Sequence, residues 1–406
     1  MNYDILSIEE NAFVLKCEAS RLSASKKSKI ERFGVRRFEG GRMFQTSRLG
    51  SAPVERLIAD TKEWGGLGTN YDSGFAPART DHRKASFVDE NVLESYKETL
   101  NFLNNKFPDF VFNGECGVTN STTSMKSSYG LDLSMTGGVC EWYFAYQRKG
   151  SGNMIDGFIE GKSAKPNIQQ AVDEHLEFIH AHGKIKALKN GSIPVVFMDA
   201  TAPLKKLKES FMVNKYKEGS ALYSKKLGQK LFDSKISLID RSYDPSHGLL
   251  GFFDGEGIVR DHDLNLIDQG KFQSTISDIR FGKKYGTQST GNGLRPYNRG
   301  VNLMFNSLQF KKGTTPWRQI VKNLDQCIVA FVAAGGDSND LGEFSTPVQI
   351  GYVLEKGVVV GQAPQVTLKT SVDNYLGKNF IDVSSDGFLA DSASACVISE
   401  VDILVN

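Results

Sequence analysis

Residues 189–200 read KNGSIPVVFMDA, and this stretch decides how the chain is divided. Its first half, around Asn190 and Gly191, is a turn signal, and residues 193–198 form a short apolar run with the length of a buried strand. A chain of 406 residues is too long for one ordinary hydrophobic core. We therefore predict two domains, residues 1–190 and 191–406.

Before this turn, stretches typical of helices alternate with stretches typical of strands. The helical spacing of apolar residues predicts three helices, at residues 54–64, 92–107 and 167–182. The second carries the stripe Leu93, Tyr96, Leu100 and Leu103, and the third lies between Pro166 and Gly183. Polar, β-favouring segments at residues 117–129 and 140–148 predict strands. We expect an N-terminal α/β layered domain.

After the turn the sequence is rich in glycine and in short apolar runs. Residues 348–354 and 358–360 are separated by Glu355-Lys356-Gly357, which predicts a β-hairpin. Helices are expected at residues 202–211 and after Thr315-Pro316, where Thr315 would cap and the helix would continue to Leu324. We predict a mostly antiparallel β domain here, and an α+β fold for the whole chain.

The composition excludes several classes of protein. A formal charge of +2 results from 49 basic and 47 acidic residues that are interleaved, so no basic face for nucleic acid is expected. No apolar run is long enough to span a membrane, and the first ten residues lack a secretory signal. The five cysteines are scattered without a CxxC pair, so we expect reduced, mostly buried thiols. We predict a cytoplasmic protein that binds neither nucleic acid nor membrane.

Four motifs follow one another in the second half of the chain. They are Ser220-Ala221-Leu222 with Lys226-Leu227-Gly228, Phe253-Asp254-Gly255-Glu256-Gly257, Thr290-Gly291-Asn292-Gly293 with Arg295, and Gly342-Glu343-Phe344-Ser345. In this order they resemble the TldD/PmbA family, whose members are also called modulators of DNA gyrase. In the first half, residues 34–42 and 118–121 also resemble family strands. The resemblance covers nearly the whole chain.

The resemblance implies a two-subunit metallopeptidase that degrades unfolded peptides or matures peptide precursors. Its zinc subunit, TldD, presents HExxxH on the helix after the strand that matches residues 193–198. Here that position, residues 202–209, reads APLKKLKE and contains no histidine. The chain therefore resembles the TldE branch, with no zinc or other cofactor of its own and with zinc expected on a TldD-like partner. Whether this chain is itself an enzyme stays open.

The expected partners are a TldD-like subunit, in a heterodimer, and a peptide substrate. We assign no catalytic or metal-binding residue to this chain. We predict substrate binding by Asp254 and Glu256, in a motif that the resemblance places on the inner face of the second domain. Asn292 and Arg295 are added because an amide and a guanidinium suit peptide carbonyls and carboxylates.

Two alternatives remain from the residues themselves. Carboxylates and imidazoles are concentrated between residues 247 and 263 and could make a stand-alone hydrolase, for which a homodimer is one option. These residues are His247, Asp254, Glu256, Asp261, His262 and Asp263. The chain could also be a peptide-binding homodimer without peptidase work. A third group, His175, Glu177, His180 and His182, is interpreted as surface and rim residues of a helix.

Overall fold

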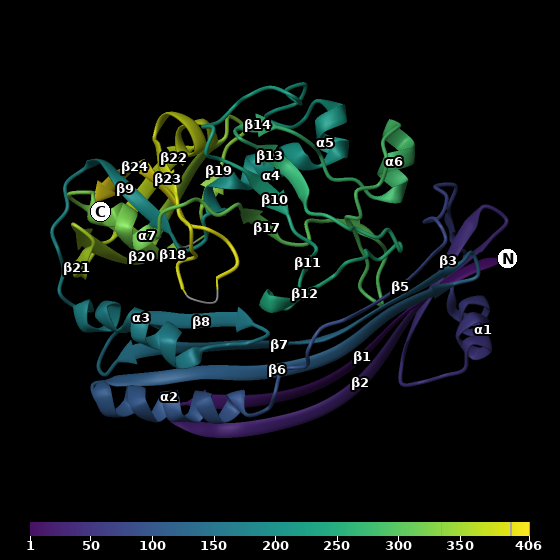
Figure 1. Ribbon diagram of the computed structural model, residues 1–406, viewed down its shortest axis with the longest axis horizontal. Helices are drawn as coiled ribbons and strands as arrows, with labels where there is room; N and C mark the ends of the chain where they lie inside the picture. The colour runs from purple at the N-terminus through teal and green to yellow at the C-terminus, as the bar shows by residue number, and fades with distance from the viewer. Residues whose placement is uncertain (334, 390–391, 406) are drawn as a thin grey trace.

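The computed structural model describes residues 1–333, 335–389 and 392–405, which form two layers lying one above the other (Figure 1). The lower layer is an eight-stranded sheet in the order β4-β3-β2-β1-β6-β7-β5, with β8 beside β7. Its strands are β1 (Asn2–Glu18), β2 (Arg21–Glu39), β3 (Arg42–Leu49), β4 (Thr69–Asn70), β5 (Arg79–Lys84), β6 (Phe110–Ser127), β7 (Leu131–Arg148) and β8 (Gly157–Ser163). Neighbouring strands are antiparallel apart from β5 and β7.

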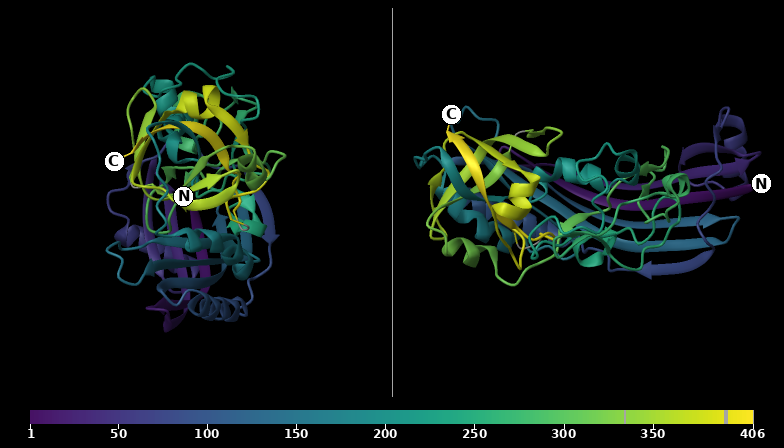
Figure 2. Two further views of the ribbon diagram at one scale, coloured as in Figure 1. Left: turned by 90° about the vertical axis from the view of Figure 1, so that its left-hand side faces the viewer. Right: turned by 90° about the horizontal axis from the view of Figure 1, so that it is seen from above.

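In the long strands, buried and partly exposed side chains alternate, as expected for a sheet with one face packed against the core. In β7, Leu131, Leu133 and Met135 are buried, and the residues between them are only partly buried. A two-residue turn at Ala19-Ser20, with both φ angles positive, joins β1 to β2. These strands run along the long axis of the molecule and extend beyond the upper layer (Figure 2).

Three helices accompany the first sheet and confirm the helical predictions. They are α1 (Val54–Trp64), α2 (Val92–Lys106) and α3 (Ile168–Ala181). The predicted stripe of α2 is buried, and α2 packs against β6. The side chain of Asn167 caps α3 by accepting a hydrogen bond from the backbone N–H of Gln170.

The second sheet has the order β18-β9-β24-β22-β20-β19, and β18 also pairs with β20, so five of its strands close into a ring. Its strands are β9 (Gly191–Phe197), β18 (Cys327–Ala333), β19 (Asp337–Ser338), β20 (Glu343–Glu355), β21 (Val358–Gln362), β22 (Val366–Ser371), β23 (Phe380–Val383) and β24 (Val397–Val405). All described pairs except β9 with β18 are antiparallel, which confirms the expected β-rich second half. The predicted hairpin is β20–β21, with Lys356 and Gly357 at positive φ.

Shorter strands and helices complete the upper layer (Figure 1). The strands are β10 (Leu238–Asp240), β11 (Tyr243–Asp244), β12 (Leu249–Leu250), β13 (Leu264–Asp268), β14 (Lys271–Phe272), β15 (Gly293–Leu294), β16 (Asn302–Leu303) and β17 (Leu308–Phe310). The helices are α4 (Lys205–Phe211), α5 (Val213–Glu218), α6 (Ile279–Tyr285) and α7 (Trp317–Lys322). α7 differs from its prediction, because Pro316 rather than Thr315 is the N-cap and the helix ends before Leu324.

One hydrophobic core crosses from the first sheet to the second. The buried Tyr146 of β7 lies with its hydroxyl 3.3 Å from that of Tyr352 in β20, among aromatic residues of both sheets. A second core fills the ring of the upper sheet. The division into residues 1–190 and 191–406 stays a prediction. No helix in the described part of the chain is long and apolar enough to cross a membrane.

Candidate functional site

The four residues predicted to bind substrate lie together in the interior. Asp254, Glu256, Asn292 and Arg295 are 6%, 3%, 1% and 4% exposed. Asp254 accepts hydrogen bonds from the backbone N–H groups of Glu256, Ile258 and Gly293, at 2.8 to 3.0 Å. Glu256 accepts one from the N–H of Ile279 at 2.8 Å. These carboxylates hold the Phe253–Gly257 turn against the strand at Gly293.

The two carboxylates share a poorly hydrated space. Burial raises the pKa of Asp254 to about 6, and burial followed by the charge of Asp254 raises the pKa of Glu256 to about 7. A Cβ atom on Gly293 would lie 2.7 Å from Glu256 Oε2 and 3.1 Å from Asp254 Oδ2. Glycine is therefore required where the backbone passes between the two side chains.

Asn292 and Arg295 also use their polar atoms inside the protein. Asn292 Nδ2 donates to Asp240 at 2.7 Å, and Arg295 donates to Asp4 at 2.7 Å and to the carbonyl of Gly34 at 2.6 Å. Asp4 is completely buried, and the guanidinium of Arg36 binds its other face. Arg295 thus ties the second half to β1 and β2. Peptide binding by the four residues stays a prediction, and the contacts described here give them a structural role.

The histidines of α3 do not form one site. His175 was expected on the helix surface, but it is completely buried, with Nε2 3.0 Å from the hydroxyl of Tyr146. Burial lowers its pKa to about 3, so the ring is neutral. His180 packs against Phe107, and His182 lies 3.6 Å from Asp156. The surface prediction for His175 is wrong because its ring packs among the aromatic rings of Phe178 and Phe331, where the hydroxyl of Tyr146 binds Nε2 and Nδ1 has no hydrogen-bond partner among the described residues.

Residues between 247 and 263 are also dispersed. His247 Nδ1 lies 2.9 Å from Asp244, Asp261 pairs with two arginines of β5, and Asp263 pairs with Arg241. In the described ranges, no group of three or more histidine, cysteine, aspartate or glutamate residues is arranged to hold a metal ion. The alternative of a stand-alone hydrolase therefore gains no assembled metal centre from this segment.

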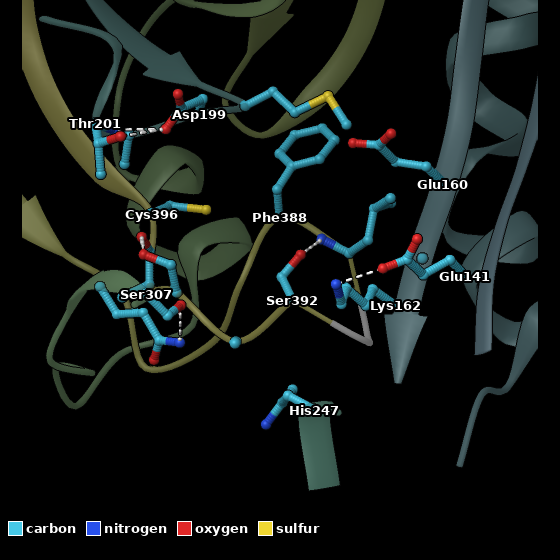
Figure 3. Close-up of a pocket in the computed structure, with 18 of the residues that line it drawn as sticks. Glu141, Glu160, Lys162, Asp199, Thr201, His247, Ser307, Phe388, Ser392 and Cys396 are labelled. Atoms are coloured by element: carbon cyan, nitrogen blue, oxygen red, sulfur yellow. Dashed lines mark hydrogen bonds and ion pairs between the residues drawn. The ribbon is translucent and has the colours of Figure 1, made fainter. Parts of the chain in front are cut away.

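A cavity of about 850 Å³ lies between the two layers, and no sequence pattern indicated it. One wall comes from β6, β7 and β8, and the other comes from the end of β9 and the residues 306–309, 388–389 and 392–396. Figure 3 shows Glu141, Glu160 and Lys162 on the first wall and Asp199 and Thr201 on the second, with the ring of Phe388 between them. Its volume suits a peptide segment.

The polar groups of this cavity are adapted to binding. Asp199 accepts hydrogen bonds from the backbone N–H and the hydroxyl of Thr201, both at 2.8 Å. Lys208 Nζ donates to the same hydroxyl at 2.9 Å, and burial lowers the pKa of this lysine. Cys396 also lines the cavity, but burial raises the pKa of its thiol to about 12, so at neutral pH it is not a nucleophile.

The helix after β9 decides whether zinc fits here. A 3₁₀ turn (Ala202–Leu204) leads into α4, which buries Leu204, Leu207 and Phe211 in the second core. Its remaining positions include lysines that bind acidic side chains or Thr201. A catalytic zinc ion needs about three protein ligands. Around this corner the cavity offers the carboxylate of Asp199 and no histidine from α4, so the residues do not fit a catalytic zinc ion.

Comparisons with known proteins agree on a single family. The family described as the PmbA/TldA metallopeptidase C-terminal domain matches residues 190–403. TldE from Thermococcus kodakarensis has a similar structure, with a TM-score of 0.86 and 20% identity over 100% of this chain and 97% of that one. A proposed modulator of a DNA gyrase from Thermotoga maritima has a TM-score of 0.76 and 17% sequence identity, and the match covers 99% of this chain and 96% of that one. A second proposed modulator of DNA gyrase, from Bacteroides thetaiotaomicron, has a TM-score of 0.78 and 13% sequence identity, and the match covers 100% of this chain and 95% of that one. No curated protein sequence matches this chain.

Proposed function

Since the chain belongs to the PmbA/TldD metallopeptidase family, we propose that it is a TldE-type subunit that holds peptide for a zinc-bearing, TldD-like partner. In this proposal it works in the cytoplasm, in the degradation of unfolded peptides or the maturation of peptide precursors. It supplies half of the enclosure and no catalytic zinc. The similarity to solved structures supports the TldE-like fold, and the residues around the cavity support the role of a peptide-holding subunit without zinc.

The observation that carries the proposal is the donor set at the start of α4. Where the zinc subunit is expected to have two histidines and a glutamate, this chain has lysines and leucines that are used in ion pairs and in the core. His247 also lines the cavity, but its imidazole is bound to Asp244. A water molecule at this corner would have no metal ion to activate it.

The cavity supports the peptide-holding part of the proposal. β8 has β7 as its one neighbour among the described strands, and Phe158, Glu160, Gly161 and Lys162 of β8 line the cavity. An extended peptide lying along this edge would gain main-chain hydrogen bonds that do not depend on its sequence. Such binding suits a subunit that handles many unfolded chains.

A pull-down from the native cell, followed by peptidase and zinc assays, tests the proposal. We expect co-purification of a chain bearing HExxxH, zinc in that chain, and peptide turnover by the complex but not by this chain alone. Turnover by the isolated chain would overturn the proposal in favour of the stand-alone hydrolase. Recovery of a homodimer without a zinc-bearing partner would favour the peptide-binding homodimer.

A further inference from the structure

The cavity carries a charge opposite to that of the whole chain. Four carboxylates line it, from Glu115, Glu141, Glu160 and Asp199, against the single lysine Lys162. The chain as a whole has a formal charge of +2. Carboxylates that face one enclosed space concentrate negative potential there and attract cations.

Two of these carboxylates keep charge available for a ligand. Glu141 pairs with Lys162, and Glu115 lies 3.7 Å from Lys16. Glu160 is exposed to the cavity and has no ion pair or hydrogen bond with any described residue. Burial by the surrounding protein raises the pKa of Glu160 above its usual value.

Asp199 lies on the opposite wall of the cavity from Glu160, with the ring of Phe388 between them (Figure 3). Its Oδ1 atom accepts both hydrogen bonds from Thr201. The ammonium group of Lys208, which donates to the same Thr201 hydroxyl, interacts with the charge of Asp199 without forming an ion pair with it. Oδ2 therefore remains for a ligand. The two carboxylates come from β8 and from the end of β9, so a group between them would touch both layers of the fold.

A second kind of group points to a peptide ligand. Trp142 lines the cavity and is 2% exposed, yet its Nε1–H donates to none of the described residues. Gly161, its partner across β7 and β8, makes room for the indole, because a Cβ atom there would lie 2.6 Å from Nε1. An indole N–H without an acceptor suits a peptide carbonyl.

The apolar part of the cavity suits a long side chain. The rings of Tyr143, Phe158 and Phe388 line it beside the carboxylates. Lysine and arginine place their methylene groups along apolar surfaces while the charged end binds an acid, and aromatic faces attract such cations.

We propose that this cavity selects peptides with a cationic group, a lysine or arginine side chain or a free amino terminus, bound by the carboxylates of Glu160 and Asp199 that line it. The inference rests on the proposed function, since it assumes that this cavity is where peptide is held. It names the substrate class that the cavity favours.

Fluorescence anisotropy with the full chain tests the inference. The probes are labelled peptides of one neutral sequence that carry Lys, Gln or Glu at the same central position, each with a free and with an acetylated amino terminus. We expect the Lys peptide to bind about fivefold more tightly than the Gln peptide, the size of one partly shielded ion pair. The Glu peptide should bind more weakly than either.

Matched variants identify the groups responsible. Glu160→Gln should remove most of the preference for Lys over Gln, and Asp199→Asn should reduce it while the amide oxygen still accepts from Thr201. Glu98→Gln removes the same charge from the exposed surface of α2 and should leave the preference unchanged. If the peptides with a free amino terminus bind more tightly than the acetylated ones whatever the central residue, the amino terminus is the favoured cation.

The outcomes separate the two proposals. Equal binding of all peptides, or a preference that survives Glu160→Gln and Asp199→Asn together, would overturn the inference and leave the peptide-holding function standing. Absence of binding by any peptide, to the chain or to its complex with a partner, would overturn the proposed function as well.

Discussion

The carboxylate of Glu256 should make the protein less stable as the pH rises, and Glu256→Gln should remove this dependence. In the folded chain Glu256 is 3% exposed, and burial beside Asp254 raises its pKa from 4.5 to about 7. Between these values the folded chain keeps a proton that the unfolded chain has released. Its contribution to stability is therefore complete below pH 4.5 and is lost as the pH rises through about 7.

The magnitude follows from the interval between the two pKa values. That interval corresponds to about 3 kcal/mol at 25 °C, of which about 2 to 3 kcal/mol is lost between pH 5 and pH 8. A glutamine at 256 does not titrate, and its amide oxygen can still accept from the N–H of Ile279. The advantage of Glu256→Gln over the natural chain should therefore grow by about 2 to 3 kcal/mol from pH 5 to pH 8.

Urea denaturation of the two proteins at both pH values measures this difference, because groups far from residue 256 titrate alike in both proteins and their contributions cancel. Glu98→Gln, an exposed change on α2, serves as the control and should show no growth with pH. The reasoning is refuted if Glu256→Gln shows the same advantage, or none, at pH 5 and at pH 8.

Two further predictions concern buried groups that join distant parts of the chain. Asp4→Asn should destabilise the fold by about 3 to 5 kcal/mol in thermal or urea unfolding, because it leaves the buried guanidinium groups of Arg36 and Arg295 without their counter-charge. Glu90→Gln, which removes an exposed ion pair, serves as the control and should change the stability little. Equal effects of the two changes would contradict the account. His175 is buried and neutral with a pKa lowered to about 3, so stability is lost as the pH falls below 6.5, by about 1.4 kcal/mol per pH unit. His175→Gln should be less sensitive to acid between pH 6 and pH 4 in urea titrations, and an unchanged acid dependence would show that His175 already carries a proton.

The sequence predicted those helices and hairpins that depend on residues close together in the chain. The apolar spacing at residues 92–107 predicted α2, and Glu355-Lys356-Gly357 predicted the hairpin of β20 and β21. The full lengths of β1 and β2 were missed because the first part of β2 is polar on both faces and exposed, so no alternation marks it. Its pairing partner β1 orders this part of the strand instead.

The site escaped prediction because distant segments build it. Glu160, Asp199 and Phe388 lie far apart in the sequence, and they meet only when the closed sheet packs over β6 to β8. His175 was misplaced for the same reason, since the hydroxyl of Tyr146, from another strand, makes its burial acceptable. The residues at 254–256 and 292–295 were predicted to bind substrate, and this stays a prediction. The structure shows them in buried contacts that join segments far apart in the chain.

Metal analysis of the purified chain after exposure to zinc and removal of the excess tests the central claim most directly. With lysines and leucines where the zinc subunit is expected to carry its ligands, the account predicts far less than one zinc ion per chain, and full zinc content only in a complex with an HExxxH partner. One tightly held zinc ion per isolated chain, lost on substitution of Asp199 or His247, would contradict it.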